Sequence, residues 1–190
     1  LQRAINDCRA DDILYFPAGD YLTGALQLHS DLEIYLSKGA VLQGTANIND
    51  YSPRIPSRFE GTEMRCYSSL LNAGRLDHTK ASVCHNIIVR GKGTICGGGQ
   101  VLAKKIIEDE RARIKSFLDD NEELVKSCEN DDTIPGRVRP RLVNLSNCEN
   151  VWFSGITFKN SPAWTFHMVY CDNIQTDHCV FESEGVWNGD

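Results

Sequence analysis

The sequence predicts an all-β fold, a right-handed parallel β-helix in which one chain winds through successive coils. The main observation is a repeat: residues 148–158 align with residues 171–181 at a constant offset of 23 positions, with cysteine, asparagine and phenylalanine at matching places. A fixed period in this range is typical of stacked units that are each too small to bury an apolar face alone. The second observation is that the units consist of short β-branched and aromatic runs ending at Asn or Gly, which favours strands and turns.

The first hundred residues fit the start of such a stack. Residues 1–10 carry apolar side chains at helical spacing, which predicts a short capping helix over the open first coil. Residues 11–100 are expected to form the first coils, because runs such as 12–19 and 31–39 each read as a strand closed by a glycine-containing corner.

Two segments are expected to leave the stack. Residues 51–66 are polar and contain Pro53 and Pro56, which predicts a loop. Residues 101–138 begin with a run of helix formers carrying both signs of charge, which predicts a helical insertion and a linker that wall one end of a cleft. The coils resume over residues 139–190. We interpret residues 1–190 as one incomplete β-helix domain, the front part of a longer protein, because no initiator Met is present and Asp190 falls within an expected strand.

Charge and hydropathy argue against some partners. The net charge is −6 and no dense run of Lys or Arg occurs, which argues against nucleic acid, and a polyanionic ligand would need locally placed basic residues. There is no apolar stretch of roughly 18 residues, so no membrane-spanning helix is expected. The sequence does not indicate an oligomeric state.

The eight cysteines permit a disulfide framework, but their spacing favours another interpretation. Cys84, Cys148 and Cys171 each stand three residues before an Ile or Val that an Asn directly precedes, so they would stack on successive coils as buried thiols. Zinc is a weaker interpretation because no paired Cys-x-x-Cys spacing is present. We expect no metal and no cofactor.

A column of polar residues predicts the functional site. Asn144, His167 and Asp190 are separated by 23 positions each, so they would be neighbours on adjacent strands. Side chains alternate along a strand, and with Val143, Leu145, Phe166 and Met168 facing inward, Asn144 and His167 face outward. By the same alternation Asn188 and Asp190 face outward, with Gly189 between them facing inward. We call this column the outer strip and take it as the candidate active site.

Residues around this strip resemble a known family. The segment Asn160-Ser161-Pro162-Ala163-Trp164-Thr165-Phe166-His167, followed by Asn188-Gly189-Asp190, is similar to the polygalacturonases of glycoside hydrolase family 28. The resemblance covers nearly the whole chain and implies a pectin-lyase-like β-helix that hydrolyses α-1,4-galacturonosyl bonds with inversion and without a metal. It implies that Asp190 helps to activate water, and that an adjacent aspartate pair about one coil later, not in this chain, supplies the general acid and a second base. The 190 residues alone are therefore expected to be inactive.

The expected ligand is a galacturonan polysaccharide or oligosaccharide. Asn188, His167, Asn144 and Trp164 are the expected binding residues, although His167 could also be a turn or core histidine and Trp164 could simply pack against Trp187. The triplet Arg113-Ile114-Lys115 spells the family's carboxylate-gripping motif, but it lies in the helical insertion, so we assign it to a charged helix face.

Two other functions stay open. A pectate lyase shares the β-helix but needs calcium-binding acidic clusters, and none is evident on the strip. A non-catalytic β-helix that binds polysaccharide would lack the carboxylates downstream of Asp190. The compartment is open as well, because family members are commonly secreted whereas stacked free thiols suit a reducing cytoplasm.

Overall fold

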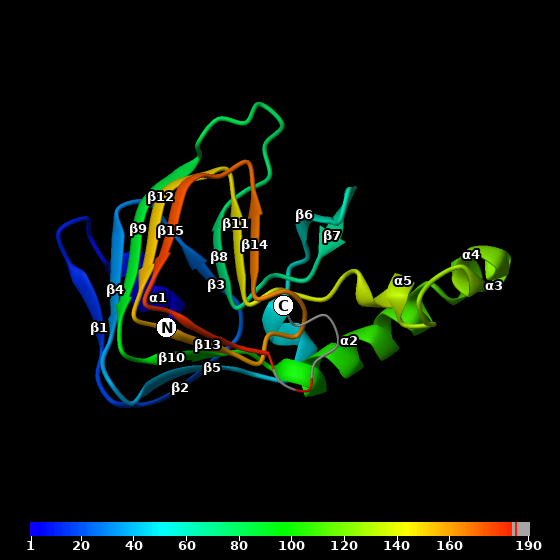
Figure 1. Ribbon diagram of the computed structural model, residues 1–190, viewed down its shortest axis with the longest axis horizontal. Helices are drawn as coiled ribbons and strands as arrows, with labels where there is room; N and C mark the ends of the chain where they lie inside the picture. Colours follow the sequence, from blue (N-terminus) through cyan, green and yellow to red (C-terminus); the bar gives the residue numbers. More distant parts are fainter. Residues whose placement is uncertain (184, 186–190) are drawn as a thin grey trace.

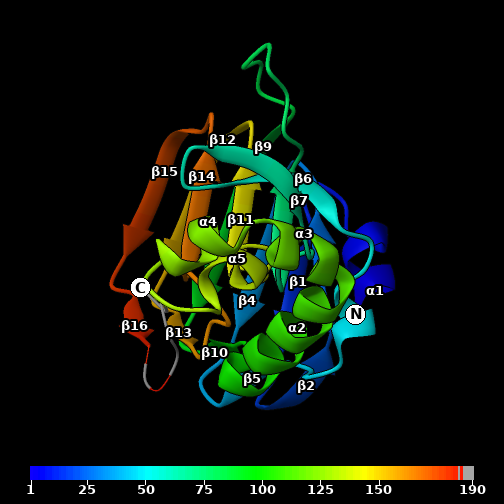
Figure 2. The same ribbon diagram turned by 90° about the vertical axis from the view of Figure 1, so that its right-hand side faces the viewer.

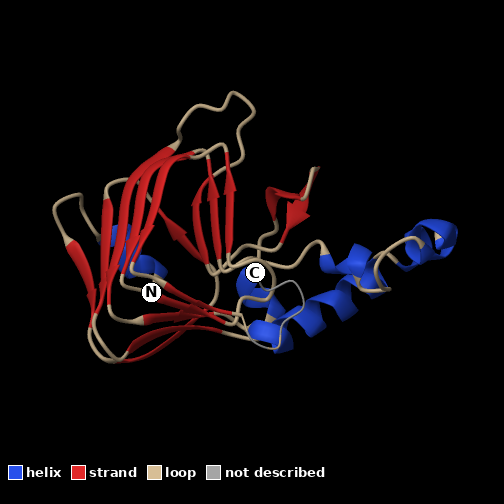
Figure 3. Ribbon diagram, viewed as in Figure 1, coloured by secondary structure: helices blue, strands red, loops and turns tan. Residues whose placement is uncertain are grey.

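The computed structural model describes residues 1–183 and Gly185, and within them the chain winds as a parallel β-helix (Figures 1 and 3). Each coil visits three sheets in the same order. Sheet 1 contains β1 (Ile13–Phe16), β4 (Leu32–Leu36), β9 (Cys84–Gly91), β12 (Cys148–Ser154) and β15 (Asp172–Asp177). Sheet 2 contains β2 (Gly19–Thr23), β5 (Ala40–Gly44), β10 (Thr94–Cys96), β13 (Thr157–Lys159) and β16 (Val180–Glu182). Sheet 3 contains β3 (Leu26–Leu28), β8 (Leu71–Gly74), β11 (Val143–Ser146) and β14 (Phe166–Val169).

The 23-residue period is the strand register of the last coils. Val151 pairs with Ile174 in sheet 1, Phe158 with Phe181 in sheet 2, and Asn144 with His167 in sheet 3. The predicted fold class is therefore confirmed, because one period connects neighbouring strands in all three sheets.

The core lies inside the coil and is built by alternation along each strand. In β4, for example, Leu32, Ile34 and Leu36 are buried and the residues between them are half-buried. Val143 and Leu145 are fully buried as predicted. Met168, which was expected inside, is 52% exposed, because it lies on β14, the last strand of sheet 3 among the described residues, and none of them covers it.

Helix α1 (Gln2–Asp7) closes the first coil. Its residue Ile5 is completely buried, and Gln2 bonds the open edge of β3: its Oε1 accepts from the backbone N of Gln27 at 2.7 Å and its Nε2 donates to the Gln27 carbonyl at 2.8 Å. An unpaired strand edge is a template for aggregation, and a helix that satisfies it removes that hazard.

The repeated asparagines are explained by a sharp bend within sheet 1. Asn86, Asn150 and Asn173 all adopt left-handed backbone conformations, with φ of 56°, 55° and 51°. Asn tolerates this region better than most residues. The side chains form a ladder in which Asn173 Nδ2 donates to Asn150 Oδ1 at 2.7 Å.

All eight cysteines are free, and the stacked-thiol interpretation is confirmed for Cys84 and Cys148, whereas Cys171 is only half-buried. Cys84 and Cys148 are buried partners in register between β9 and β12. Cys171 stands one period further along, immediately before β15.

Gly155 occupies a corner at which no side chain fits. Its φ is +73°, and an added Cβ would lie 2.2 Å from the Gly91 carbonyl oxygen. We expect Gly155→Ala to lower the free energy of unfolding by about 2–4 kcal/mol, since left-handed strain and overpacking add. Gly61→Ala is the matched control, because a Cβ there meets nothing within 4 Å. Urea denaturation of both variants checks this, and equal midpoints would contradict it.

Two excursions leave the stack between sheet 2 and sheet 3. The first contains a 3-10 turn (Ile48–Tyr51) and an antiparallel hairpin of β6 (Ile55–Phe59) and β7 (Thr62–Cys66). The loop predicted over residues 51–66 is thus mostly a hairpin, which we call the β6–β7 hairpin. The second contains α2 (Gly99–Arg113), α3 (Lys115–Asp120), α4 (Glu122–Lys126) and α5 (Thr133–Gly136).

The two excursions pack against each other beside sheet 3 (Figures 1 and 2). They share a small apolar core of Tyr51, Tyr67, Leu102, Ile106 and Val138. Across it Arg54 Nη2 donates to the buried carboxylate of Glu110 at 2.7 Å. None of the described helices has the length and apolarity needed to cross a membrane.

Candidate active site

The candidate site is centred on His167 in β14. Its outward direction follows from the strand alternation, and its register partner Asn144 lies beside it on β11. The His167 Nδ1 atom is 3.0 Å from Asn144 Oδ1. The same amide oxygen accepts a hydrogen bond from Ser57 Oγ at 3.5 Å. Because an amide oxygen can only accept, Nδ1 carries the proton of the imidazole.

His167 is neutral around neutral pH. Burial, and then the positive charges of Arg141 and Arg58, lower the pKa of His167 from 6.5 to about 4. With the proton on Nδ1, Nε2 holds a free lone pair, and none of the described residues donates to it. His167 therefore offers a fixed hydrogen-bond acceptor on the outer strip and no positive charge.

This lowered pKa predicts a pH-dependent stability. The folded state favours neutral His167, so its contribution is fully present above pH 6.5 and is lost as the pH falls from 6.5 toward about 4. Wild type should lose stability relative to His167→Gln over this window. Urea denaturation at pH 7 and at pH 4.5 measures the difference, and parallel losses in both proteins would refute the assignment.

The β6–β7 hairpin lies against the outer face of sheet 3 (Figure 2). Phe59 stacks on Trp164 with ring centroids 4.5 Å apart, and Trp164 stacks on His167 at 5.7 Å. Arg141 lies over the rings of Phe59 and Trp164, at 5.3 and 5.2 Å. The hairpin and the strip are therefore one packed unit.

Arg141 fastens this unit although it is only 1% exposed and none of the described carboxylates pairs with it. Its Nη2 donates to the Arg58 carbonyl at 2.7 Å, and its Nη1 donates to the Arg139 carbonyl at 3.2 Å. Burying a guanidinium without a carboxylate partner costs desolvation free energy. The bond from Arg141 to the Arg58 carbonyl therefore ties the hairpin to the strip.

The structure changes the interpretation of two predicted binding residues. Asn144 faces outward as predicted, but it is only 3% exposed because the hairpin covers it, so it orients His167 and does not itself reach a ligand. Trp164 is half-buried, and one ring face is occupied by Phe59. Asn188 and Asp190 lie outside the described residues, as does Trp187.

The strip upstream of Asn144 is structural. Asn72, which pairs with Asn144 in register, is 4% exposed and its side chain bonds the backbone of Ser69 and Leu26. Among the described residues, the accessible part of the strip thus begins at His167.

Basic side chains gather at this accessible end. Arg58, on the hairpin, and Lys80, on the loop between β8 and β9, lie 6.0 and 5.2 Å from the centroid of the Tyr170 ring. Tyr170 directly follows β14. The overall charge is negative, so this local positive end is the kind of feature that an anionic ligand requires.

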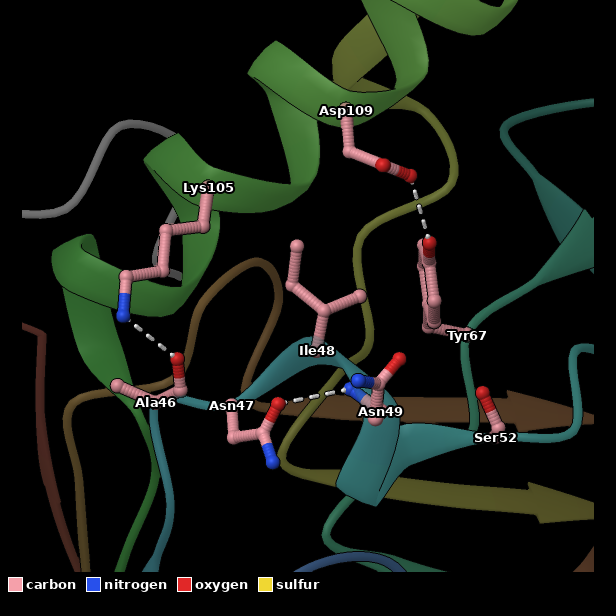
Figure 4. A pocket seen from close by; sticks show the side chains of 8 residues that line it. All are labelled: Ala46, Asn47, Ile48, Asn49, Ser52, Tyr67, Lys105 and Asp109. Carbon is pink, nitrogen blue, oxygen red and sulfur yellow. Dashed lines mark hydrogen bonds between the residues drawn. The ribbon is translucent and has the colours of Figure 1, made fainter.

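A separate hollow lies between the two excursions (Figure 4). Its charged side chains are already paired: Lys105 Nζ donates to the Ala46 carbonyl at 3.1 Å, and Tyr67 donates its hydroxyl to Asp109 at 3.1 Å. We therefore regard it as a seam in the packing. Among residues 1–183, no three His, Cys, Asp or Glu side chains converge in a way that could hold a metal ion.

The triplet in the helical insertion does not reach the strip. Arg113 pairs with Glu110 and Lys115 pairs with Asp119 at 2.6 Å, as expected of charged helix faces. Burial raises the pKa of Glu110, but Arg113 and Arg54 lower it more, so its pKa lies below the ordinary value and the carboxylate stays ionised between the two excursions.

A parallel β-helix that presents a polar strip on one outer sheet is the architecture of the pectin-cleaving glycosidases, the class that the sequence resembles. No family model matches the chain. The chain is 25% identical over 205 residues to the exo-poly-alpha-D-galacturonosidase of Dickeya chrysanthemi, an alignment that covers 100% of this chain and 34% of that protein. It is 27% identical over 165 residues to a Vitis vinifera protein named "Probable polygalacturonase", covering 85% of this chain and 27% of that one.

Solved structures agree. The family 28 exopolygalacturonase of Yersinia enterocolitica superposes with a TM-score of 0.77 at 25% identity, covering 100% of this chain and 36% of that one. The exopolygalacturonase of Thermotoga maritima superposes with a TM-score of 0.72 at 24% identity, covering 99% of this chain and 43% of that one. The resemblance to family 28 polygalacturonases is confirmed, and the chain spans 34% and 27% of the length of these two curated relatives.

Sequence reasoning missed the residues that the hairpin contributes, namely Ser57, Arg58 and Phe59. A signal was present, since apolar or small residues alternate with polar ones on both sides of Glu60-Gly61, a pattern typical of a hairpin. Pro53 and Pro56 obscured it. Nothing local in the sequence indicates that this hairpin folds onto His167.

Proposed function

We propose that this protein is a polygalacturonase-type glycoside hydrolase that cleaves α-1,4-galacturonosyl bonds in pectin or oligogalacturonides with inversion. The observation that supports it best is the register of sheet 3. Asn144 pairs with His167, and the same 23-residue step leads to Asp190. A carboxylate would then follow a neutral histidine on the accessible end of the outer strip.

The residues divide the work as follows. An inverting glycosidase needs one carboxylate to activate water and one protonated carboxyl to protonate the leaving oxygen. Asp190 would activate the water, and an adjacent aspartate pair about one coil later, which the family resemblance implies, would take the remaining roles. His167 would accept a hydrogen bond from a sugar hydroxyl at Nε2, and Asn144 would hold the ring in that tautomer. Asn188 would face the same side as Asp190.

We also propose that cleavage is from a chain end. A polysaccharide running along the whole strip would have to pass over Asn72 and Asn144, and both are buried. The β6–β7 hairpin occupies that path, with Ser57 against Asn144 and Phe59 against Trp164. A substrate could thus extend from His167 in only one direction. The names of the similar proteins from Dickeya chrysanthemi and Yersinia enterocolitica also indicate exo action.

The test is hydrolysis of polygalacturonate by the full-length protein. We expect release of reducing sugar, short products from the earliest times, little initial fall in viscosity, and an inverted anomeric configuration by NMR. An unsaturated product absorbing in the ultraviolet would indicate a lyase instead. Binding without any bond cleavage would indicate the non-catalytic β-helix.

A further inference from the structure

The guanidinium of Arg58 lacks the carboxylate partner that three other arginines on the excursions have. Arg54 pairs with Glu110, Arg111 with Asp132, and Arg113 with Glu110. Arg58 makes no ion pair with any described carboxylate, and its Nε is buried without a hydrogen-bond partner. Buried cationic groups are normally paired, because desolvation penalises an isolated charge.

The position of Arg58 is fixed by its neighbours. Its own carbonyl accepts from Arg141 at 2.7 Å, and the next residue, Phe59, stacks on Trp164. Its guanidinium lies 6.0 Å from the Tyr170 ring and close enough to His167 to help lower the pKa of that imidazole. The charge is therefore held beside the accessible end of the strip.

A second cation reaches the same place from another segment. Lys80 lies 5.2 Å from the Tyr170 ring, and its loop is anchored by the fully buried Asn147. The Asn147 side chain donates to the carbonyls of Asp77 and Ala81 at 2.9 and 3.1 Å and accepts from the Asp77 backbone N at 2.9 Å. A cation–π contact contributes roughly 0.5–1 kcal/mol at an exposed site, which does not replace an anion.

We propose that Arg58 binds the carboxylate of the galacturonate unit that lies against His167, with Lys80 as a second, weaker partner. The inference rests on the proposed function and names the residue that selects an acidic sugar. An arginine fork binds a carboxylate through two parallel hydrogen bonds, whereas Nε2 of His167 accepts from a hydroxyl. One sugar unit would thus be recognised twice: Arg58 would donate to its carboxylate, and His167 Nε2 would accept from one of its hydroxyl groups.

The test compares an acidic and a neutral substrate. In the full-length protein, Arg58→Gln should raise KM for trigalacturonate roughly tenfold or more, in line with the strength of charge-assisted hydrogen bonds. Its kcat should stay within about twofold, because the contact is made in ground state and transition state alike. On the methyl-esterified trisaccharide the variant and wild type should be nearly equal. Arg58→Lys, which keeps the charge and the stem, should give an intermediate KM.

Arg65→Gln is the matched control. It removes one positive charge from the same hairpin at an exposed position whose side chain, among the described residues, bonds the Arg54 carbonyl alone, so KM should stay unchanged. An unaltered KM in Arg58→Gln, or an equal loss on the acidic and the esterified substrate, would overturn the inference.

The same experiment separates this inference from the proposed function. If wild type cleaves nothing, the proposed function fails, and calorimetric binding of trigalacturonate then decides about Arg58. Weaker binding by Arg58→Gln and Arg58→Lys than by wild type supports the inference, and equal binding by all three refutes it.

Discussion

Replacing Asp190 with asparagine is expected to lower kcat on polygalacturonate by roughly 10²- to 10⁴-fold, the usual contribution of a positioned general base. The 23-residue step that pairs Asn144 with His167 leads on to Asp190, the residue that we propose activates the attacking water. Asparagine keeps the size and polarity of the side chain but cannot accept a proton from water. Because binding is largely retained, KM should change little.

Initial-rate kinetics of the full-length protein measure this effect. Asp20→Asn is the control, since it neutralises an exposed carboxylate on β2 in sheet 2, away from the strip. It should keep full activity. If Asp190→Asn kept at least half of the wild-type kcat, Asp190 would not be the general base. The proposed role of this residue on the outer strip would then be wrong.

Replacing Arg141 with methionine is expected to release the β6–β7 hairpin and lower kcat/KM by roughly 10- to 100-fold. The substitution leaves the carbonyls of Arg58 and Arg139 without their donor, at about 1–3 kcal/mol for each buried group that stays unpaired. The hairpin can relieve its share by lifting into water, and Arg58 would move away from the strip with it. Removing a buried charge offsets part of the loss, so global stability should fall less than local order.

Hydrogen exchange over residues 55–66 is the most direct readout of this release. Exchange should become faster there in Arg141→Met while the strands of sheet 1 keep their protection. Arg65→Met is the control, because it alters an exposed residue of the same hairpin. Unchanged exchange in Arg141→Met would mean that the aromatic stack of Phe59 on Trp164 alone holds the hairpin.

The agreement between sequence and structure depends on how local each signal is. The 23-residue step is carried by neighbouring coils without insertions, so it predicted the pairs Asn144 with His167 and Phe158 with Phe181. Asn72 and Asn144 pair in the same way, but the helical insertion lies between them in the sequence. Their separation therefore differs from 23 residues, and the repeat could not predict this pair.

Burial was harder to predict than direction. Alternation correctly pointed Asn144 outward, yet an outward side chain is exposed only when nothing covers it. The covering group, Ser57, stands 87 residues earlier in the chain. Met168 shows the opposite case, an inward position that no described residue covers.

The sequence alone thus determined the coil, its register, the stacked thiols and the family resemblance, because these depend on a repeated pattern of side chains along a regular backbone. The tertiary structure alone decided that a hairpin lies on the strip, that Arg141 fastens it, and that His167 is a neutral acceptor beside an unpaired Arg58. Those properties arise from contacts between segments that an insertion or a turn brings together, and no periodicity in the chain encodes such contacts.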